Sequence, residues 1–267
     1  EDRRAHLIPI LKAMDYKAWA EWYDIFYSSA DPSDIEFYKS LCIASGGPIL
    51  EIGVGTGRIA LPLSEYGLEV VGIDLYEPML KAAHKRALES APLKGNLQLI
   101  KADMRNFDVG RKFPIVTIPA RTLLLATSEQ EQFQTLCNAA KHLDYDGTMA
   151  FNLFYPDPNM LHDDPNKEFL LDVIDKSEGG RYVLTAKNQF DLKNQINDGT
   201  QIVEEFDSDG NLLKRVELTV VVRYLYPEQI TKLLDRVGLK LLEIWGDFEG
   251  GELNEQSEEI VILARHS

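Results

Sequence analysis

Cysteine is scarce in this chain, and the patterns of secreted and membrane proteins are missing. The 267 residues include two cysteines, Cys42 and Cys137, too few and too isolated for a disulfide framework or a zinc site. No run of about 18 apolar residues exists, so we expect no membrane span. The first residues lack the apolar region and cleavage site of a signal peptide. We therefore expect a cytoplasmic protein without a metal site.

Positive charge is also scarce. Lysine and arginine number 28 against 43 aspartate and glutamate residues, which gives a formal net charge of −15. Such a field repels a phosphate backbone, and nucleic-acid-binding proteins usually show the opposite balance. The charge therefore favours a small-molecule partner, and we expect neither nucleic acid nor a membrane.

Short apolar runs alternate with helical patterns in the first part of the chain. Such runs are typical of buried strands, and their alternation with helices predicts a parallel sheet covered on both faces. Ser128 followed by Glu131 is a capping-box pattern that marks the start of one helix. We expect strands at residues 48–55, 68–75, 96–104, 113–120 and 148–155.

The pattern changes after residue 156. In "LLKRVELTVVVRYL" (212–225) apolar and polar residues alternate, and "SDGN" just before it favours a hairpin turn. We expect an antiparallel β insertion over residues 157–226. It would serve as a substrate cover or as a dimer face, so a homodimer is possible.

The α/β pattern resumes with a helix at 227–238 and strands at 239–247 and 258–266. The connection between these strands is about ten residues, which is short for a parallel crossover, so the last strand should be antiparallel. The expected fold is α/β: a Rossmann-like seven-stranded sheet, mostly parallel with an antiparallel last strand, plus the insertion. We divide the chain into an N-terminal helical lid (1–45), a core (46–156 and 227–267) and the insertion.

Three glycines follow the first expected strand in "LEIGVGTG" (50–57). A glycine-rich turn at this edge of a parallel sheet is where ligands bind, because the backbone can approach a bulky group closely. The glycines could also serve only the tight turn. The dinucleotide pattern G-x-G-x-x-G needs its third glycine one residue later than Gly57. A nicotinamide-dependent oxidoreductase therefore remains the weaker alternative.

The segment resembles the E/D-x-G-x-G-x-G motif of class I S-adenosylmethionine (AdoMet) methyltransferases. Asp74 in "GIDL" and Asp103 in "KADM" stand at the ends of the next two strands, as in that family. The resemblance implies that Asp74 accepts from the ribose hydroxyls and Asp103 from the adenine amine. It also implies that Leu75 and Met79 sandwich the adenine. The implied cofactor-binding residues are Tyr23, Glu51, Gly53, Gly55, Gly57, Arg58, Asp74, Leu75, Met79, Asp103, Met104 and Pro119.

Three regions are candidates for the acceptor pocket. The aromatic segment "WAEWYDIFY" (19–27) is either a packed helix face or a lid over the cofactor. Arg121 follows the fourth strand and is either a substrate ligand or a surface ion pair. A loop histidine, His162, is a candidate base, although such residues are more often only solvated. The substrate-binding candidates are Trp19, Tyr27, Arg121, Phe154 and Tyr155, and the catalytic candidates are Tyr23, Arg121 and His162.

The predicted function is methyl transfer from AdoMet to a small-molecule nitrogen or oxygen, with S-adenosylhomocysteine (AdoHcy) as product. No unambiguous base is present, which favours nitrogen slightly, because a hydroxyl acceptor needs a proton acceptor nearby. Residues 118–127, "IPARTLLLAT", lack the Asp/Asn-Pro-Pro-Tyr motif of nucleic-acid amino-methyltransferases. A catalytically silent AdoMet-binding module remains a further alternative.

Overall fold

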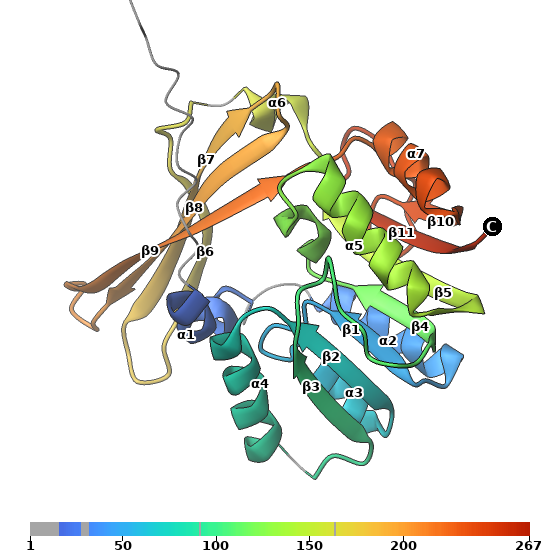
Figure 1. Ribbon diagram of the computed structural model, residues 1–267. Coiled ribbons are helices and arrows are strands. Elements are labelled where there is room, and N and C mark those ends of the chain that lie inside the picture. Colours follow the sequence, from blue (N-terminus) through green and yellow to red (C-terminus); the bar gives the residue numbers. More distant parts are fainter. Residues whose placement is uncertain (1–15, 28–31, 91, 163) are drawn as a thin grey trace, which may run out of the picture.

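A seven-stranded sheet forms the centre of the molecule (Figure 1). The computed structural model describes residues 16–27, 32–90, 92–162 and 164–267. The spatial strand order is β10-β11-β5-β4-β1-β2-β3, and β11 runs antiparallel to both of its neighbours while the other pairs are parallel. This confirms the expected fold class. The strands are β1 (Ile49–Ile52), β2 (Glu69–Asp74), β3 (Asn96–Lys101), β4 (Phe113–Ile118), β5 (Leu143–Phe154), β10 (Leu239–Trp245) and β11 (Glu259–His266).

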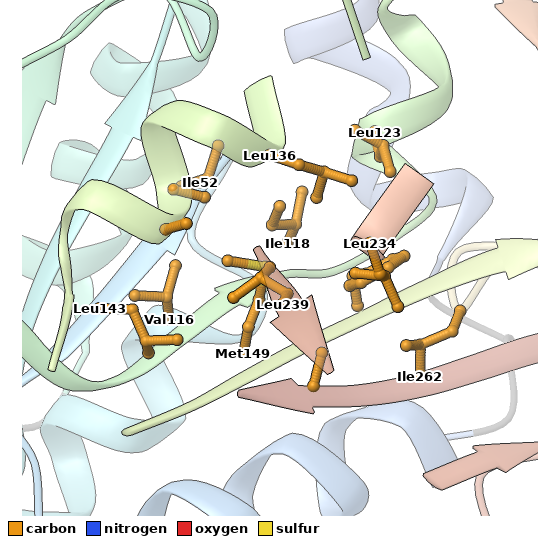
Figure 2. Packing of buried hydrophobic residues seen from close by; sticks show 14 of the residues in the cluster. Ile52, Val116, Ile118, Leu123, Leu136, Leu143, Met149, Leu234, Leu239 and Ile262 are labelled. Atoms are coloured by element: carbon orange, nitrogen blue, oxygen red, sulfur yellow. The ribbon is translucent and has the colours of Figure 1, made fainter. Parts of the chain in front are cut away.

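Helices cover both faces of this sheet. Successive strand residues point to opposite faces, so Leu50 and Ile52 join one apolar cluster and Ile49 joins the other. The first cluster includes Leu136 and Leu234, which lie against the strands in Figure 2. Helices α5 (Glu129–Lys141) and α7 (Pro227–Val237) contribute to the first cluster; α2 (Ser33–Ser45), α3 (Ala60–Tyr66) and α4 (Glu77–Glu89) contribute to the second.

The insertion folds as a separate antiparallel sheet beside the core (Figure 1). Its strands pair in chain order, and the last hairpin closes where the Asp207 N–H donates to the Asn211 carbonyl at 3.0 Å. The predicted antiparallel arrangement is therefore confirmed. The elements are α6 (Pro158–Leu161), which leads in, and β6 (Phe169–Asp175), β7 (Arg181–Asp191), β8 (Ile196–Phe206) and β9 (Leu212–Arg223).

Helix α1 (Tyr16–Phe26) lies between the base of the second sheet and α4 (Figure 1). Trp19 and Trp22 are buried against Leu184, Val203 and Leu218 of the second sheet. The aromatic segment is therefore a packed face. None of the helices in the described ranges has the length and apolar character needed to span a membrane.

The predicted lid boundary at residue 45 is too late in the chain. Helix α2 buries Tyr38 and Cys42 completely in the cluster on the core sheet, so it belongs to the core. Among the described residues of the predicted lid, Trp19, Tyr23 and Tyr27 line the cavity described below. Residues 1–15 and 28–31 of the predicted lid lie outside the described residues.

Candidate active site

A cavity of about 750 Å³ opens between the ends of β1, β2 and β4, helix α1 and the second sheet. This volume lies within the range of small-molecule sites. The predicted residues that line it are Trp19, Tyr23, Tyr27, Gly53, Gly55, Asp74, Leu75, Met79, Asp103, Met104, Arg121, Phe154 and Tyr155. The predicted residues that do not line it are Glu51, Gly57, Arg58, Pro119 and His162.

The glycine loop divides into two roles. Gly53 has φ +76°, and a Cβ there would lie 2.3 Å from the Thr122 side chain, so no larger residue fits. The N–H of Gly55 donates to Asp74 Oδ2 at 2.9 Å inside the cavity. Gly57 instead lies against Leu61 and serves the packing of the helix. Gly53, Gly55 and Asp74 therefore form one wall of the cavity, which we call the cradle, whereas Gly57 does not line the cavity.

Asp74 closes the far side of the cradle. Its Oδ1 accepts from the Tyr76 N–H at 2.9 Å, and its Oδ2 accepts from the Gly55 N–H. Burial raises the pKa of this carboxyl, and the backbone N–H groups oppose that rise because they stabilise the charged form. An ionised carboxylate has further lone pairs. Asp74 can therefore still accept from the two hydroxyls of a ribose.

Asp103 is held by an arginine that sequence reasoning missed. Arg105 Nη2 lies 2.6 Å from Asp103 Oδ2, and the hydrogen bonds from Arg105 lower the pKa of the Asp103 carboxyl. Arg105 also pairs with Glu131. The capping box at α5 is therefore only half formed: Ser128 Oγ accepts from the Glu131 N–H, but the Glu131 carboxylate turns to Arg105 and to the N–H of Thr127.

Glu51 lies behind the cradle, and one of its carboxyl oxygens has no hydrogen-bond partner. The side chain is buried, and its Oε2 has no hydrogen bond. Burial raises its pKa to about 8; the charge of Arg58 opposes the rise and the charge of Asp74 adds to it. Such a buried orphan oxygen requires a donor. The resemblance assigns Glu51 to the cofactor site, and the ammonium group in the amino-acid part of AdoMet would supply such a donor if it lay against this carboxyl.

Arg58 is held by other side chains on the edge of a neighbouring cavity. Its Nη1 donates to Asp34 Oδ1 at 2.9 Å, and its guanidinium lies 4.6 Å from the centre of the Tyr27 ring. The Nε of Arg58 is buried without a partner. The Nε–H group of Arg58 is therefore an unused donor on a residue that the resemblance assigns to the cofactor site.

Helix α1 is fastened to the glycine loop by Asp24. Its Oδ1 accepts from the Thr56 hydroxyl at 2.8 Å and from Arg86 Nη1 at 2.9 Å. Tyr23 lines the cavity, and burial raises its pKa well above 10. The segment is thus both packed and part of the cavity wall. Sequence reasoning missed Asp24, although it stands inside the quoted aromatic segment.

Arg121 stands in a strained loop at the cavity mouth. Ala120 and Arg121 have φ values of 53° and 60°, a conformation that costs about 1–2 kcal/mol for each non-glycine residue. Arg121 Nε donates to Glu259 Oε1 at 2.9 Å, and Glu259 also accepts from Asn152 Nδ2 at 2.9 Å. Arg121 is therefore an ion-paired residue of the wall. His162 is exposed outside the cavity, and its Nδ1 lies 2.8 Å from the Pro158 carbonyl oxygen.

Comparison with known proteins finds methyltransferases. Residues 49–147 match the family described as methyltransferase domain. The putative methyltransferase YqeM of Bacillus subtilis is 26% identical over 95% of this chain and 98% of its own. A dTDP-3-amino-3,4,6-trideoxy-α-D-glucopyranose N,N-dimethyltransferase of Streptomyces venezuelae is 28% identical over 49% of this chain and 55% of its own.

The fold has a close counterpart among solved structures. The CcbJ methyltransferase from Streptomyces caelestis superposes with a TM-score of 0.80 over 95% of this chain and 98% of its own, at 23% identity. The region that matches the methyltransferase family, residues 49–147, contains the glycine loop, Asp74 and Asp103. This family match favours a methyltransferase over a nicotinamide-dependent oxidoreductase. The family match over residues 49–147, the relatives named methyltransferases and the cavity at the strand ends support an S-adenosylmethionine-dependent methyltransferase with AdoMet as its cofactor.

Proposed function

We propose that this enzyme methylates the amine nitrogen of a small polar molecule that lies between the cradle and the second sheet. The main observation behind this proposal is one cavity that extends from Gly55 and Asp74 to strands β7, β8 and β9 of the second sheet. The methyl donor at one end and the methyl acceptor at the other would share this one cavity. Such an arrangement supports catalysis by proximity, in which the protein aligns the reacting groups.

The side chains of the cavity favour nitrogen over oxygen. Within the described part of the chain, no histidine lines the cavity. The raised pKa of Tyr23 makes its phenolate inaccessible, and Asp74 and Asp103 are held by hydrogen bonds. A hydroxyl acceptor needs a base at the reacting atom, whereas a neutral amine already carries a lone pair.

Four further carboxylates line the cavity, those of Glu131, Asp157, Glu255 and Glu258. Glu131 is paired with Arg105, and Asp157 accepts from the Asn159 N–H. An amine is the acceptor that needs none of these carboxylates as a base.

Bound AdoMet supplies an electrophilic methyl group on a sulfonium. The residues of this chain would hold the cofactor and exclude water. Asp74, held by the Gly55 N–H, would orient the nucleoside part, and α1, held by the Asp24 contact with Thr56, would cover it. The acidic surface adds to this, because a protein with a net charge of −15 attracts an acceptor in its ammonium form, which must release a proton to water before its nitrogen attacks the methyl group.

A relative supports the same class of acceptor. The Streptomyces venezuelae protein named above is an N,N-dimethyltransferase of an amino-deoxy-sugar nucleotide. Its similarity covers about half of this chain. A sugar-sized amine is therefore the first acceptor to try, with or without the nucleotide.

The test is a two-stage assay. Calorimetric titration with AdoMet, AdoHcy, NADH and NADPH comes first, and binding of AdoMet and AdoHcy alone is expected. A panel of amino sugars, amino alcohols and matched polyols is then incubated with AdoMet, and products are located by mass spectrometry. Methylation of amines but not of polyols supports the proposal. Methyl groups found only on hydroxyl oxygens would exclude nitrogen as the acceptor.

A further inference from the structure

One face of the second sheet presents polar side chains to the cavity. Residues paired directly across antiparallel strands share a face, and Gly199 pairs with Asn188 on β7 and with Val220 on β9. Asn197 lies two residues before Gly199 and therefore on the same face. Asn188, Asn197, Gly199 and Val220 all line the cavity. The lower part of this face is covered by Trp19 and Trp22, but the upper part is not.

Asn197 is buried with half of its amide unmatched. The side chain is 8% exposed, and its Nδ2 donates to Asn188 Oδ1 at 2.8 Å. Its Oδ1 is buried and has no hydrogen-bond partner. Turning both amides over would exchange donor and acceptor, yet it would still leave one buried Asn197 group unpaired. A buried polar group of this kind requires a partner, and the cavity is where one can come from.

We infer that Asn197, oriented by Asn188, is a specificity-determining residue that hydrogen-bonds a hydroxyl of the methyl acceptor. A hydroxyl fits either amide orientation, because it donates and accepts. The acceptor class is then a hydroxylated amine rather than an apolar amine. Gly199 keeps this subsite open, because a Cβ there would lie 3.2 Å from Val220 and 3.4 Å from Asn188 Oδ1. The inference rests on the proposed function for the identity of the amine.

The test compares ligands that differ by one hydroxyl. The trans-2-, 3- and 4-aminocyclohexanols and cyclohexylamine are titrated into AdoHcy-loaded enzyme, and dissociation constants are measured by saturation-transfer NMR. The proteins are the wild type, Asn197→Ala, Asn197→Leu and the control Asn211→Ala, which changes a turn residue outside the cavity. We expect one or more aminocyclohexanols to bind the wild type and the control roughly tenfold more tightly than cyclohexylamine.

The two Asn197 variants should lose this preference while the dissociation constant of AdoHcy stays unchanged. Asn197→Leu should also melt no lower than the wild type, since it removes an unsatisfied buried group. A residue that only holds the strands would instead lower the melting temperature and leave the preference intact. Such a result, a wild type without preference, or failure of both variants to fold would overturn the inference.

Methyl transfer to the same amines separates this inference from the proposed function. If the hydroxyl preference depends on Asn197 but mass spectrometry finds no N-methylated product, the subsite stands and N-methylation fails. If amines are methylated without any dependence on Asn197, N-methylation stands and the subsite fails.

Discussion

Cofactor binding should release a proton from Glu51. The carboxyl is buried without a partner for Oε2, and its pKa of about 8 leaves it about 90% protonated at pH 7. An ammonium group brought against it favours the charged form. A return of the pKa from about 8 to its ordinary 4.5 corresponds to about 5 kcal/mol of interaction with the charged form. Binding at pH 7 should therefore release about 0.9 proton.

Calorimetry measures this proton directly. AdoHcy is titrated at pH 7 in phosphate and in Tris, which differ widely in ionisation enthalpy, and the slope of the observed enthalpy against that quantity gives the protons exchanged. We expect a slope near 0.9 for the wild type at pH 7. The ligand is the product, so no turnover complicates the result.

Two variants make the measurement specific. Glu51→Gln removes the titrating group, so its slope should vanish and its affinity should fall. Glu77→Gln changes an exposed glutamate at the start of α4 and should keep the wild-type slope. A wild-type slope near zero, or the same slope in Glu51→Gln, would refute the assignment of Glu51 to the ammonium group.

Four further outcomes follow from the same geometry. Asp74→Ala should weaken AdoHcy binding by about 1–3 kcal/mol in calorimetry, and a folded variant of unchanged affinity would remove Asp74 as the ribose ligand. Asp24→Ala should free α1 from the glycine loop and raise the AdoHcy dissociation constant without changing the melting temperature by more than a few degrees; unchanged affinity would argue against a covering role. Gly53→Ala should destabilise the fold by several kcal/mol in urea unfolding, because the new Cβ meets Thr122 at 2.3 Å, and Thr122→Gly should restore part of this; additive effects would contradict the steric reason. Glu51 holds its proton in the folded state up to pH 8 and loses it at lower pH when unfolded, so its own contribution to stability falls from pH 5 to pH 8. Relative to the wild type, Glu51→Gln should gain about 3.5 kcal/mol over that interval, and equal pH profiles of the two proteins would contradict the raised pKa.

The sequence by itself determined the core fold and the cradle. Apolar runs of strand length predicted β1, β2 and β4 within a few residues, because a strand buried on both faces must be largely apolar. The edge strand β3 is only partly buried, and β5 begins five residues before its predicted start at 148. The spacing of Gly53 and Gly55 and the place of Asp74 are local properties of a strand end, so the cofactor edge was readable in advance. The short connection before β11 likewise predicted its antiparallel direction, since no crossover fits it.

Tertiary structure decided which polar groups meet. Asp103 and Glu131 are far apart in the chain, and only the fold brings Arg105 between them. Asn188 and Asn197 come together because a hairpin sets the register of β7 on β8. Glu51 Oε2 has no hydrogen-bond partner because the helices on its face of the sheet exclude water. The periodicity of the sequence indicates which side of a helix or strand is buried. The hydrogen-bond partner of a side chain, the register of two strands and the local dielectric are set only when the whole chain has folded.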